Sequence, residues 1–125
     1  MAQAVGIGGI FFRARDPQAL SAWYEQHFGI SRADKTSLFF DGPGAAGMTV
    51  FAHFPHDTAY FGPATQQAML NLRVDDLDAL LVELAAAGVS IDPKRDDHAY
   101  GRFAWIIDPE GNRVELWEPP PEPAA

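Results

Sequence analysis

The sequence predicts an α+β fold in which one domain is built from two copies of a β-α-β-β plan. The first observation is that short strand-like runs alternate with stretches of helical apolar spacing along the chain. The second is an internal repeat at a distance of 60 positions, in which Arg13, Asp16, Ala19 and Leu20 recur as Arg73, Asp76, Ala79 and Leu80. The third is that the closing segments 50–55 and 114–119 match at a distance of 64.

The first copy begins with a short, glycine-bounded apolar run at 7–14, which is typical of a strand. Asp16 and Pro17 predict a helix start, because Asp accepts hydrogen bonds from the first turn and Pro suits the first helical position. We expect this helix to end at Gly29, which favours a left-handed cap. Two further strands, at 37–40 and 48–54, complete the copy, and a loop at 41–47 joins them.

The second copy repeats this order after a polar linker. A strand is expected at 68–74, and a helix is expected to run from Asp76 as its N-cap to Gly88. Two closing strands, at 100–107 and 113–117, are then joined by a turn at 108–112. The predicted divisions of the single domain 1–125 are module one at about 5–60, the linker at about 56–65, module two at about 66–119 and an extended or disordered tail at 120–125.

Length, charge and composition narrow the classes of function. The chain has 125 residues, which fits one domain. Its formal net charge of −8 argues against nucleic-acid binding and favours neutral or cationic small molecules, an aromatic ligand among them. The chain has no cysteine, and no apolar run is long enough to cross a membrane. We therefore expect a cytoplasmic protein with no membrane or nucleic-acid partner.

Strand alternation predicts where a binding site lies, because successive side chains point to opposite faces of a sheet. One set is apolar and is expected to lie beneath the helices: Ile10, Phe12, Ala14, Val50, Ala52, Phe54, Leu70, Leu72, Val74, Val114 and Leu116. The other set mixes charge, amide, imidazole and aromatic groups: Gly9, Phe11, Arg13, Thr49, Phe51, His53, Met69, Asn71, Arg73, Arg113, Glu115 and Trp117. A curved sheet would gather this second set into a concave cleft.

The passage from Arg13 to Pro17 and the segment 101–118 resemble the vicinal oxygen chelate superfamily. That superfamily includes glyoxalase I, bleomycin-resistance proteins, fosfomycin-resistance enzymes and extradiol dioxygenases. The resemblance extends over about 7–119 and implies two tandem βαβββ modules that form an open half-barrel with helices on the outer face. It also implies a homodimer, and the short chain leaves sheet edges that a second copy would cover.

The resemblance also bears on metal binding, because catalytic members hold a divalent metal with His, Gln or Glu. It places the four ligand positions at Gly9, Phe51, Met69 and Glu115, of which only Glu115 has a side chain that suits such a metal. We therefore expect no cofactor and no metal at the usual site. An alternative metal site formed by His53, His98 and Glu115 stays open.

Several side chains are candidates for chemistry or binding. Glu115 is expected either to pair with Arg13, Arg73 or Arg113, or to act as a general base or a counter-ion for a cationic ligand. His53 and His98 are the histidines expected to reach the cleft, where either could act as acid or base. Arg13 and Arg73 either pair with Asp16 and Asp76 or contact an anion. The expected ligand-binding residues are Phe11, Arg13, Phe51, Met69, Asn71, Arg73, Trp105 and Trp117.

Three functions follow from these observations, and the residues do not decide whether the protein is an enzyme. The first is a small-molecule-binding protein of the bleomycin-resistance type, without the usual divalent metal. The second is a glyoxalase-like lyase or isomerase that transfers a proton through Glu115 and a histidine. The third is a metal-dependent oxygenase of the dioxygenase superfamily.

Overall fold

A computed structural model describes residues 2–41 and 47–121 of the chain. The first module consists of β1 (Ala4–Ala14), α1 (Pro17–Phe28), β2 (Ser31–Arg32), β3 (Ser37–Phe40) and β4 (Thr49–Pro55). The second consists of β5 (Ala68–Val74), α2 (Leu77–Ala86), β6 (Ser90–His98), β7 (Gly101–Ile107) and β8 (Arg113–Glu118). Most of the loop predicted at 41–47 and most of the tail predicted at 120–125 lie outside the described residues.

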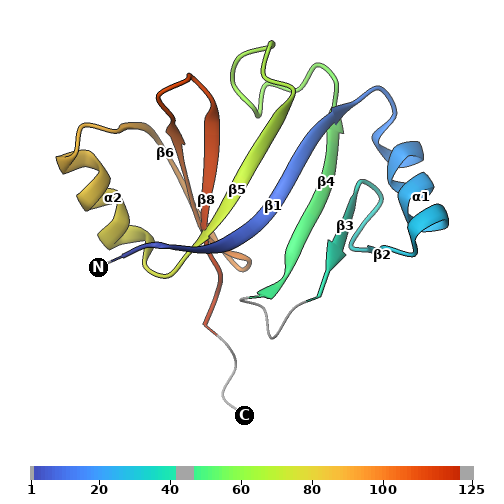
Figure 1. Cartoon of the computed structure of the whole chain (residues 1–125), viewed down its shortest axis with the longest axis horizontal. Helices are drawn as coiled ribbons and strands as arrows, with labels where there is room; N and C mark the ends of the chain where they lie inside the picture. Colours follow the sequence, from blue (N-terminus) through green and yellow to red (C-terminus); the bar gives the residue numbers. More distant parts are fainter. Residues whose placement is uncertain (1, 42–46, 122–125) are drawn as a thin grey trace.

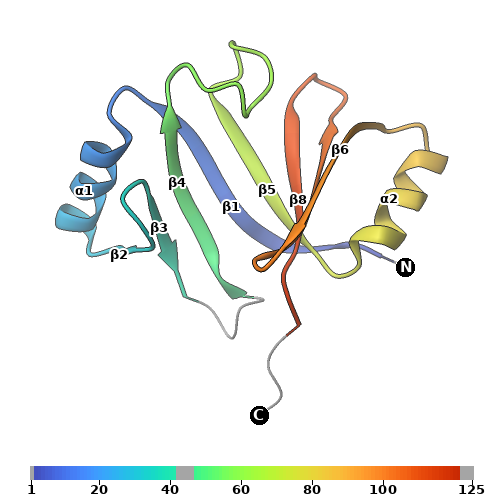
Figure 2. The same cartoon turned by 180° about the vertical axis from the view of Figure 1, so that it is seen from behind.

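All eight strands belong to one sheet in the order β2-β3-β4-β1-β5-β8-β7-β6. The modules join where β1 pairs antiparallel with β5, while β1–β4 and β5–β8 are parallel pairs within the modules. The sheet is open and curved, with α1 near one end and α2 near the other (Figures 1 and 2). The predicted α+β fold with two βαβββ modules is therefore confirmed.

The two helices begin as the repeated sequence predicts. The side chain of Asp16 accepts a hydrogen bond from the backbone N–H of Ala19 at 3.0 Å, and Asp76 accepts one from Ala79 at 3.1 Å. These caps satisfy backbone donors that a helix leaves free at its start. Among the described residues neither carboxylate forms an ion pair, so the expected pairing with Arg13 and Arg73 is wrong.

Two edge strands were not predicted, namely β2 and β6. The sequence of β6, SIDPKRDDH, is charged and contains Pro93, so it shows no apolar alternation. An edge strand needs hydrogen bonds to one neighbour only, and charged side chains together with proline discourage further pairing. β2 has two residues, which is too short for any periodicity to be read. Neither helix is long and apolar enough to span a membrane within the described parts of the chain.

The buried core consists of two clusters on opposite faces of the sheet. One lies on the concave face and contains Phe11, Ala52, Phe61, Met69 and Trp105. The other lies beneath α2 and contains Val74, Leu77, Ala104, Val114 and Leu116. Phe61 comes from the predicted linker and is fully buried. The linker is therefore part of the core and not a passive connection.

The predicted faces are wrong for β4. Its register pairs Phe11 with Ala52 and Ile10 with Phe51, and paired residues point to the same side of a sheet. Val50, Ala52 and Phe54 therefore lie on the concave face, with Phe11. Phe51 and His53 lie beneath α1, where the ring of Tyr24 contacts both rings.

The error has a simple origin in the internal repeat. Asn71 pairs with Glu115, and its counterpart 60 positions earlier, Phe11, pairs with Ala52. The true distance between equivalent positions of β4 and β8 is therefore 63, not 64. A shift of one residue moves every side chain of a strand to the opposite face. Apolar residues occur on both faces of β4, so its own composition could not reveal the slip.

Candidate functional site

The concave face carries two adjoining hollows, of about 360 and 350 Å³, which together form the feature called the cleft below. They share five lining residues: Phe11, Asp34, Ser37, Val50 and Glu115. The larger hollow is also lined by Gly8, Met48, Asn71, Phe103 and Trp117, among others. Both modules therefore contribute to the cleft, and most of its wall is apolar.

Glu115, on β8, is the charged group at the centre of this arrangement. Its side chain is 2% exposed and accepts hydrogen bonds from three different donors. The amide nitrogen of Asn71 donates to Oε1 at 2.6 Å, while the Trp105 indole donates to Oε2 at 3.0 Å. The hydroxyl of Tyr60 also donates to Oε2. Neutral donors therefore hold the carboxylate in a buried position.

The expected ion pair between Glu115 and an arginine does not form. Arg113 pairs with Asp92 instead, at 2.5 Å, and no described arginine lies within ion-pair distance of Glu115. Burial raises the pKa of Glu115 above its ordinary value, and the three hydrogen bonds and the charge of Arg113 only partly oppose that rise. The same burial and the adjacent Glu115 raise the pKa of Tyr60, so its hydroxyl remains a donor.

Asn71 links the buried carboxylate to the open part of the cleft. Its amide nitrogen is used by Glu115, but its oxygen, Oδ1, is buried without a partner among the described residues. A Cβ on Gly8 would lie 2.2 Å from this oxygen, so only glycine leaves room beside it. Since both residues line the cleft, a ligand that donates a hydrogen bond could satisfy Asn71 Oδ1.

Tyr60 was not predicted, and Arg13 explains how it reaches Glu115. The guanidinium of Arg13 donates to the backbone carbonyls of the linker, at His56, Thr58, Pro63 and Gln66, over 2.7–3.3 Å. It also lies 5.1 Å from the centre of the Phe61 ring. Arg13 therefore holds the linker against the sheet. The sequence marks Tyr60 only as one aromatic residue in a polar stretch, so no motif could identify it.

Neither predicted histidine forms a hydrogen bond with Glu115, although His53 does line the smaller hollow of the cleft. Nδ1 of His53 is 2.8 Å from the hydroxyl of Ser21 beneath α1, and burial lowers the pKa of His53. His98 stacks on Phe103 at 5.0 Å between ring centres and lines a different hollow. The three residues of the alternative metal site are therefore not brought together. No cluster of three or more His, Cys, Asp or Glu suited to a metal occurs within residues 2–41 and 47–121.

The predicted ligand-binding residues divide into three groups. Phe11, Asn71 and Trp117 line the cleft as expected. Met69 and Trp105 are each 1% exposed and belong to the core behind it. The remaining three lie elsewhere: Phe51 beneath α1, Arg13 against the linker and Arg73 at a second hollow.

The positions that the resemblance assigns to a divalent metal do not suit one. The corrected register replaces Phe51 by Ala52 as the position on β4, so the set becomes Gly9, Ala52, Met69 and Glu115. Glycine and alanine supply no donor, and a thioether suits only soft metals. The one carboxylate already accepts three hydrogen bonds. This donor set does not fit the usual divalent metal centre.

Comparisons with known proteins agree with this geometry. Residues 6–116 match the family model of the Glyoxalase/Bleomycin resistance protein/Dioxygenase superfamily. A methylmalonyl-CoA epimerase from Streptomyces coelicolor is similar over 98% of this chain and 100% of its own, with TM-score 0.74 and 14% identity. The methylmalonyl-CoA epimerase from Mycobacterium tuberculosis is similar over 94% of this chain and 90% of its own, with TM-score 0.66 and 22% identity.

A superfamily member from Vibrio splendidus 12B01 covers 94% of this chain and 99% of its own, with TM-score 0.57 and 13% identity. The search of curated proteins found no match. Identities this low show a shared fold only. The match over 6–116, together with the two-module sheet, shows that this chain belongs to the glyoxalase/bleomycin resistance protein/dioxygenase superfamily.

Proposed function

We propose that the protein binds a small, largely apolar molecule in the cleft and orients it by a hydrogen bond to Asn71. The observation that carries this proposal is Asn71 Oδ1, which is buried beside Gly8 and has no partner in the part of the chain that the structure describes. A buried polar atom without a partner costs on the order of 1–3 kcal/mol, which a ligand N–H or O–H would recover. Neutral or cationic donors fit this oxygen, whereas a carboxylate does not.

The walls of the cleft favour a flat ligand. Phe11, Val50 and Trp117 present apolar surface, and the rings of Trp117 and Phe103 lie nearly parallel at 6.2 Å and 8°. Aromatic side chains in such a cleft provide large contact areas for a ring. Binding in this way requires no metal, in agreement with the donor set at the family's metal positions.

The test compares indole and phenol, which carry a donor, with toluene, which does not. Backbone NMR titration should show indole and phenol shifting the amides of Gly8, Asn71 and Trp117, and toluene should bind more weakly. Gly8→Ala should weaken phenol binding by at least about tenfold, because its methyl group fills the space beside Oδ1. Gln3→Ala, at an exposed position just before the same strand, is the control. Equal affinity of Gly8→Ala and the wild type would refute the proposal.

A second candidate function is proton transfer by a lyase or isomerase, and the raised pKa of Glu115 favours it. In such a reaction the Glu115 carboxylate takes a proton from a carbon beside a carbonyl group, and the electron pair moves to the carbonyl oxygen. We assign no step to a histidine, because Nδ1 of His53 is engaged with the Ser21 hydroxyl and His98 lines a different hollow. Glu115→Gln should abolish exchange of solvent deuterium into a bound carbon acid without unfolding the protein. Exchange that persists in this variant would eliminate the candidate.

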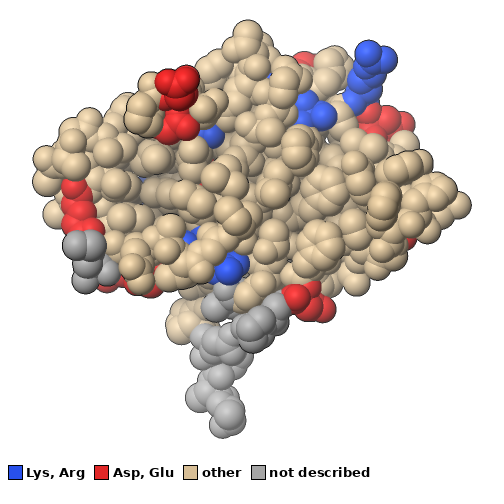
Figure 3. Space-filling view, in the orientation of Figure 1, with Lys and Arg blue, Asp and Glu red and all other residues tan. Residues whose placement is uncertain are grey.

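We also propose that two copies associate through the outer face of β1 and β5. Ile7, Ile10, Phe12 and Leu70 there are each 37–41% exposed. Charged side chains lie mainly toward the margins of the view in Figure 3. β1 and β5 are equivalent strands of the repeat and neighbours in the sheet, so this surface can meet a second copy of itself. The sheet edges are less suitable, because β2 is short and β6 is charged.

Light scattering after size-exclusion chromatography tests the dimer. Phe12→Lys should shift the protein from dimer to monomer at low concentration, since it places a charge in the apolar surface. Val82→Lys is the matched control, because Val82 on α2 is 71% exposed and lies outside this surface. A monomeric wild type would contradict the proposal, and so would a Phe12→Lys variant that stays dimeric.

A further inference from the structure

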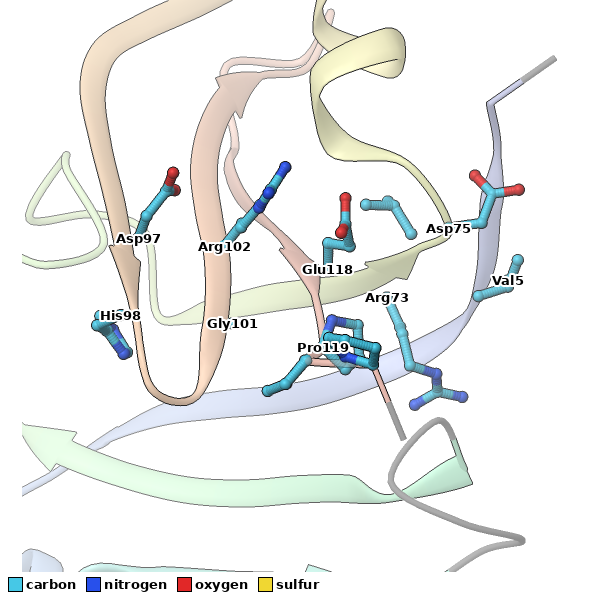
Figure 4. A pocket seen from close by; sticks show the side chains of 12 residues that line it. Val5, Arg73, Asp75, Asp97, His98, Gly101, Arg102, Glu118 and Pro119 are labelled. Carbon is cyan, nitrogen blue, oxygen red and sulfur yellow. The ribbon is translucent and has the colours of Figure 1, made fainter. Parts of the chain in front are cut away.

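A hollow separate from the cleft, of about 730 Å³, lies at the end of the sheet where β5 and β8 finish (Figure 4). Val5, Val74 and the prolines 119–121 give it apolar surface. Its charged lining residues are Arg73, Asp75, Asp97, Arg102 and Glu118, beside His98. It shares no lining residue with the cleft, so its occupancy is a separate question from the proposed function.

Arg73 is the unusual residue of this hollow, because its guanidinium is buried and no counter-ion comes from the described residues. The residue is 7% exposed, and its hydrogen bonds to described residues are made by Nη1, to the carbonyl oxygens of Ile7 at 3.3 Å and Met48 at 2.8 Å. Within residues 2–41 and 47–121, Nε is buried with no partner, and no carboxylate lies within ion-pair distance of Arg73. Burying an unpaired charge is costly, so this arrangement calls for an explanation.

The acidic residues around the hollow are engaged elsewhere. Asp75 accepts a hydrogen bond from the backbone N–H of Gln3 at 2.9 Å, and Glu118 accepts one from that of Leu77 at 2.7 Å. Asp97 pairs with Arg95 at 2.9 Å. Figure 4 shows the Arg73 guanidinium pointing away from the carboxylates of Asp75 and Glu118. These carboxylates therefore leave the charge of Arg73 available to another anion.

Gly6 fixes the position of the guanidinium. A Cβ on Gly6 would lie 2.3 Å from Nη2 and 3.1 Å from Cζ of Arg73. The absence of a side chain thus lets the planar group lie against the backbone of β1. With Nη1 held by two carbonyl oxygens, the edge formed by Nε and Nη2 keeps a defined orientation and has no partner among the described residues.

We propose that this hollow binds a small organic carboxylate through the Nε–Nη2 edge of Arg73. Two parallel N–H donors match the two oxygens of a carboxylate, which is the strongest geometry available to arginine. The apolar part of the ligand packs against Val5, Val74 and the prolines 119–121. The bound carboxylate supplies a counter-ion that the described part of the chain does not give Arg73.

A carboxylate fits this hollow better than a phosphate. Asp75, Asp97 and Glu118 surround the site, and the chain carries a net charge of −8. This field weakens binding of a doubly charged anion more than binding of a monoanion. The apolar surface also favours an organic acid over a fully hydrated inorganic ion.

The test titrates benzoate, its uncharged analogue benzamide and inorganic phosphate into the protein, observed through the arginine side-chain Nε–H resonances. Benzoate should shift the Arg73 Nε–H signal and the backbone amide of Gly6, while benzamide leaves them in place and phosphate binds more weakly. This readout needs no variant. Equal shifts with benzoate and benzamide would overturn the proposal, as would an Arg73 signal that benzoate does not move.

Variants then distinguish binding through the Nε–Nη2 edge of Arg73 from attraction by positive charge around the hollow. Arg73→Gln should weaken benzoate binding at least about tenfold, because a charge-assisted pair is lost. Arg102→Gln removes the same charge from an exposed residue that already pairs with Asp78, and it should change the affinity less than threefold. Gly6→Ala keeps the charge but displaces the guanidinium, so it should match Arg73→Gln even if the latter folds poorly. Equal losses in Arg73→Gln and Arg102→Gln would overturn the proposal.

Discussion

Asn71 and Glu115 face each other across the parallel pair β5–β8, and the Asn71 amide nitrogen lies 2.6 Å from Glu115 Oε1. One end of this amide therefore serves the buried carboxylate, while its oxygen is buried with no partner among the described residues. If a ligand binds Asn71 as proposed, its binding and the protonation of Glu115 are connected through a single side chain. This connection makes the titration of Glu115 the first property to measure.

Glu115→Gln should gain stability over the wild type as the pH rises. Because the pKa of Glu115 is raised in the folded state, that state holds the proton more tightly than the unfolded chain does. Wild-type stability therefore falls as pH rises from 4.5 through the raised pKa, and glutamine removes this loss. Melting temperatures across this range should show the difference, with exposed Glu110→Gln as the control. A variant that parallels the wild type at every pH would contradict the prediction.

Tyr60→Phe should destabilise the protein and raise the pKa of Glu115 further. The change deletes one of the three donors to the carboxylate, which costs about 1–3 kcal/mol in the free energy of unfolding. Urea denaturation measures this cost, and the pH dependence of stability reports the shift in pKa. Tyr100→Phe is a suitable comparison, since Tyr100 is 76% exposed. If both variants lose equal stability, the Tyr60 hydroxyl does not support Glu115.

Arg13→Lys should loosen the linker while leaving the sheet folded. Lysine keeps the charge but cannot reach the four carbonyl groups that the guanidinium contacts, so about 2 kcal/mol of local stability should be lost. Hydrogen exchange should accelerate for the backbone amides of Thr58 and Gln66, and much less for those of β8. The neighbouring Arg15→Lys serves as control. Unchanged exchange in the linker would show that Arg13 does not hold it.

His53 should make the protein less stable in mild acid. Burial lowers the pKa of His53 in the folded state, so the unfolded chain binds this proton more readily. The corresponding stability is complete above the ordinary value of 6.5 and is lost as pH falls below it. His53→Gln should flatten this part of the stability profile, whereas exposed His56→Gln should not. A profile that keeps its slope in His53→Gln would exclude His53 as the cause.

The sequence predicts the parts of this fold that depend on local chemistry. Asp16 and Asp76 could be recognised as caps because a carboxylate before a helix satisfies the same free N–H groups wherever it occurs. The strand 68–74 alternates clearly, so its faces were predicted correctly and Asn71 was placed in the cleft. Glu115 followed from the same alternation in β8.

Other parts depend on contacts that are distant in sequence. The pairing of β4 with β1 determines which of its residues lie on each face. A repeat distance that is wrong by one residue therefore assigns every β4 side chain to the opposite face. The donors Tyr60 and Trp105 lie 55 and 10 residues away from Glu115 in the sequence. Sequence spacing alone does not predict that these side chains contact Glu115. The lack of a counter-ion for Arg73 among the described residues is likewise a property of the folded hollow, since several carboxylates are near it in sequence.

The equivalence of Ala52 and Glu115 has a consequence for stereochemistry. Two modules of one plan enclose the cleft, but one contributes Ala52 and Phe11 where the other contributes Glu115 and Asn71. A nearly symmetric framework thus carries a hydrocarbon half and a polar half. A ligand can match both halves in one orientation only, so the two enantiomers of a chiral molecule should bind with different affinities.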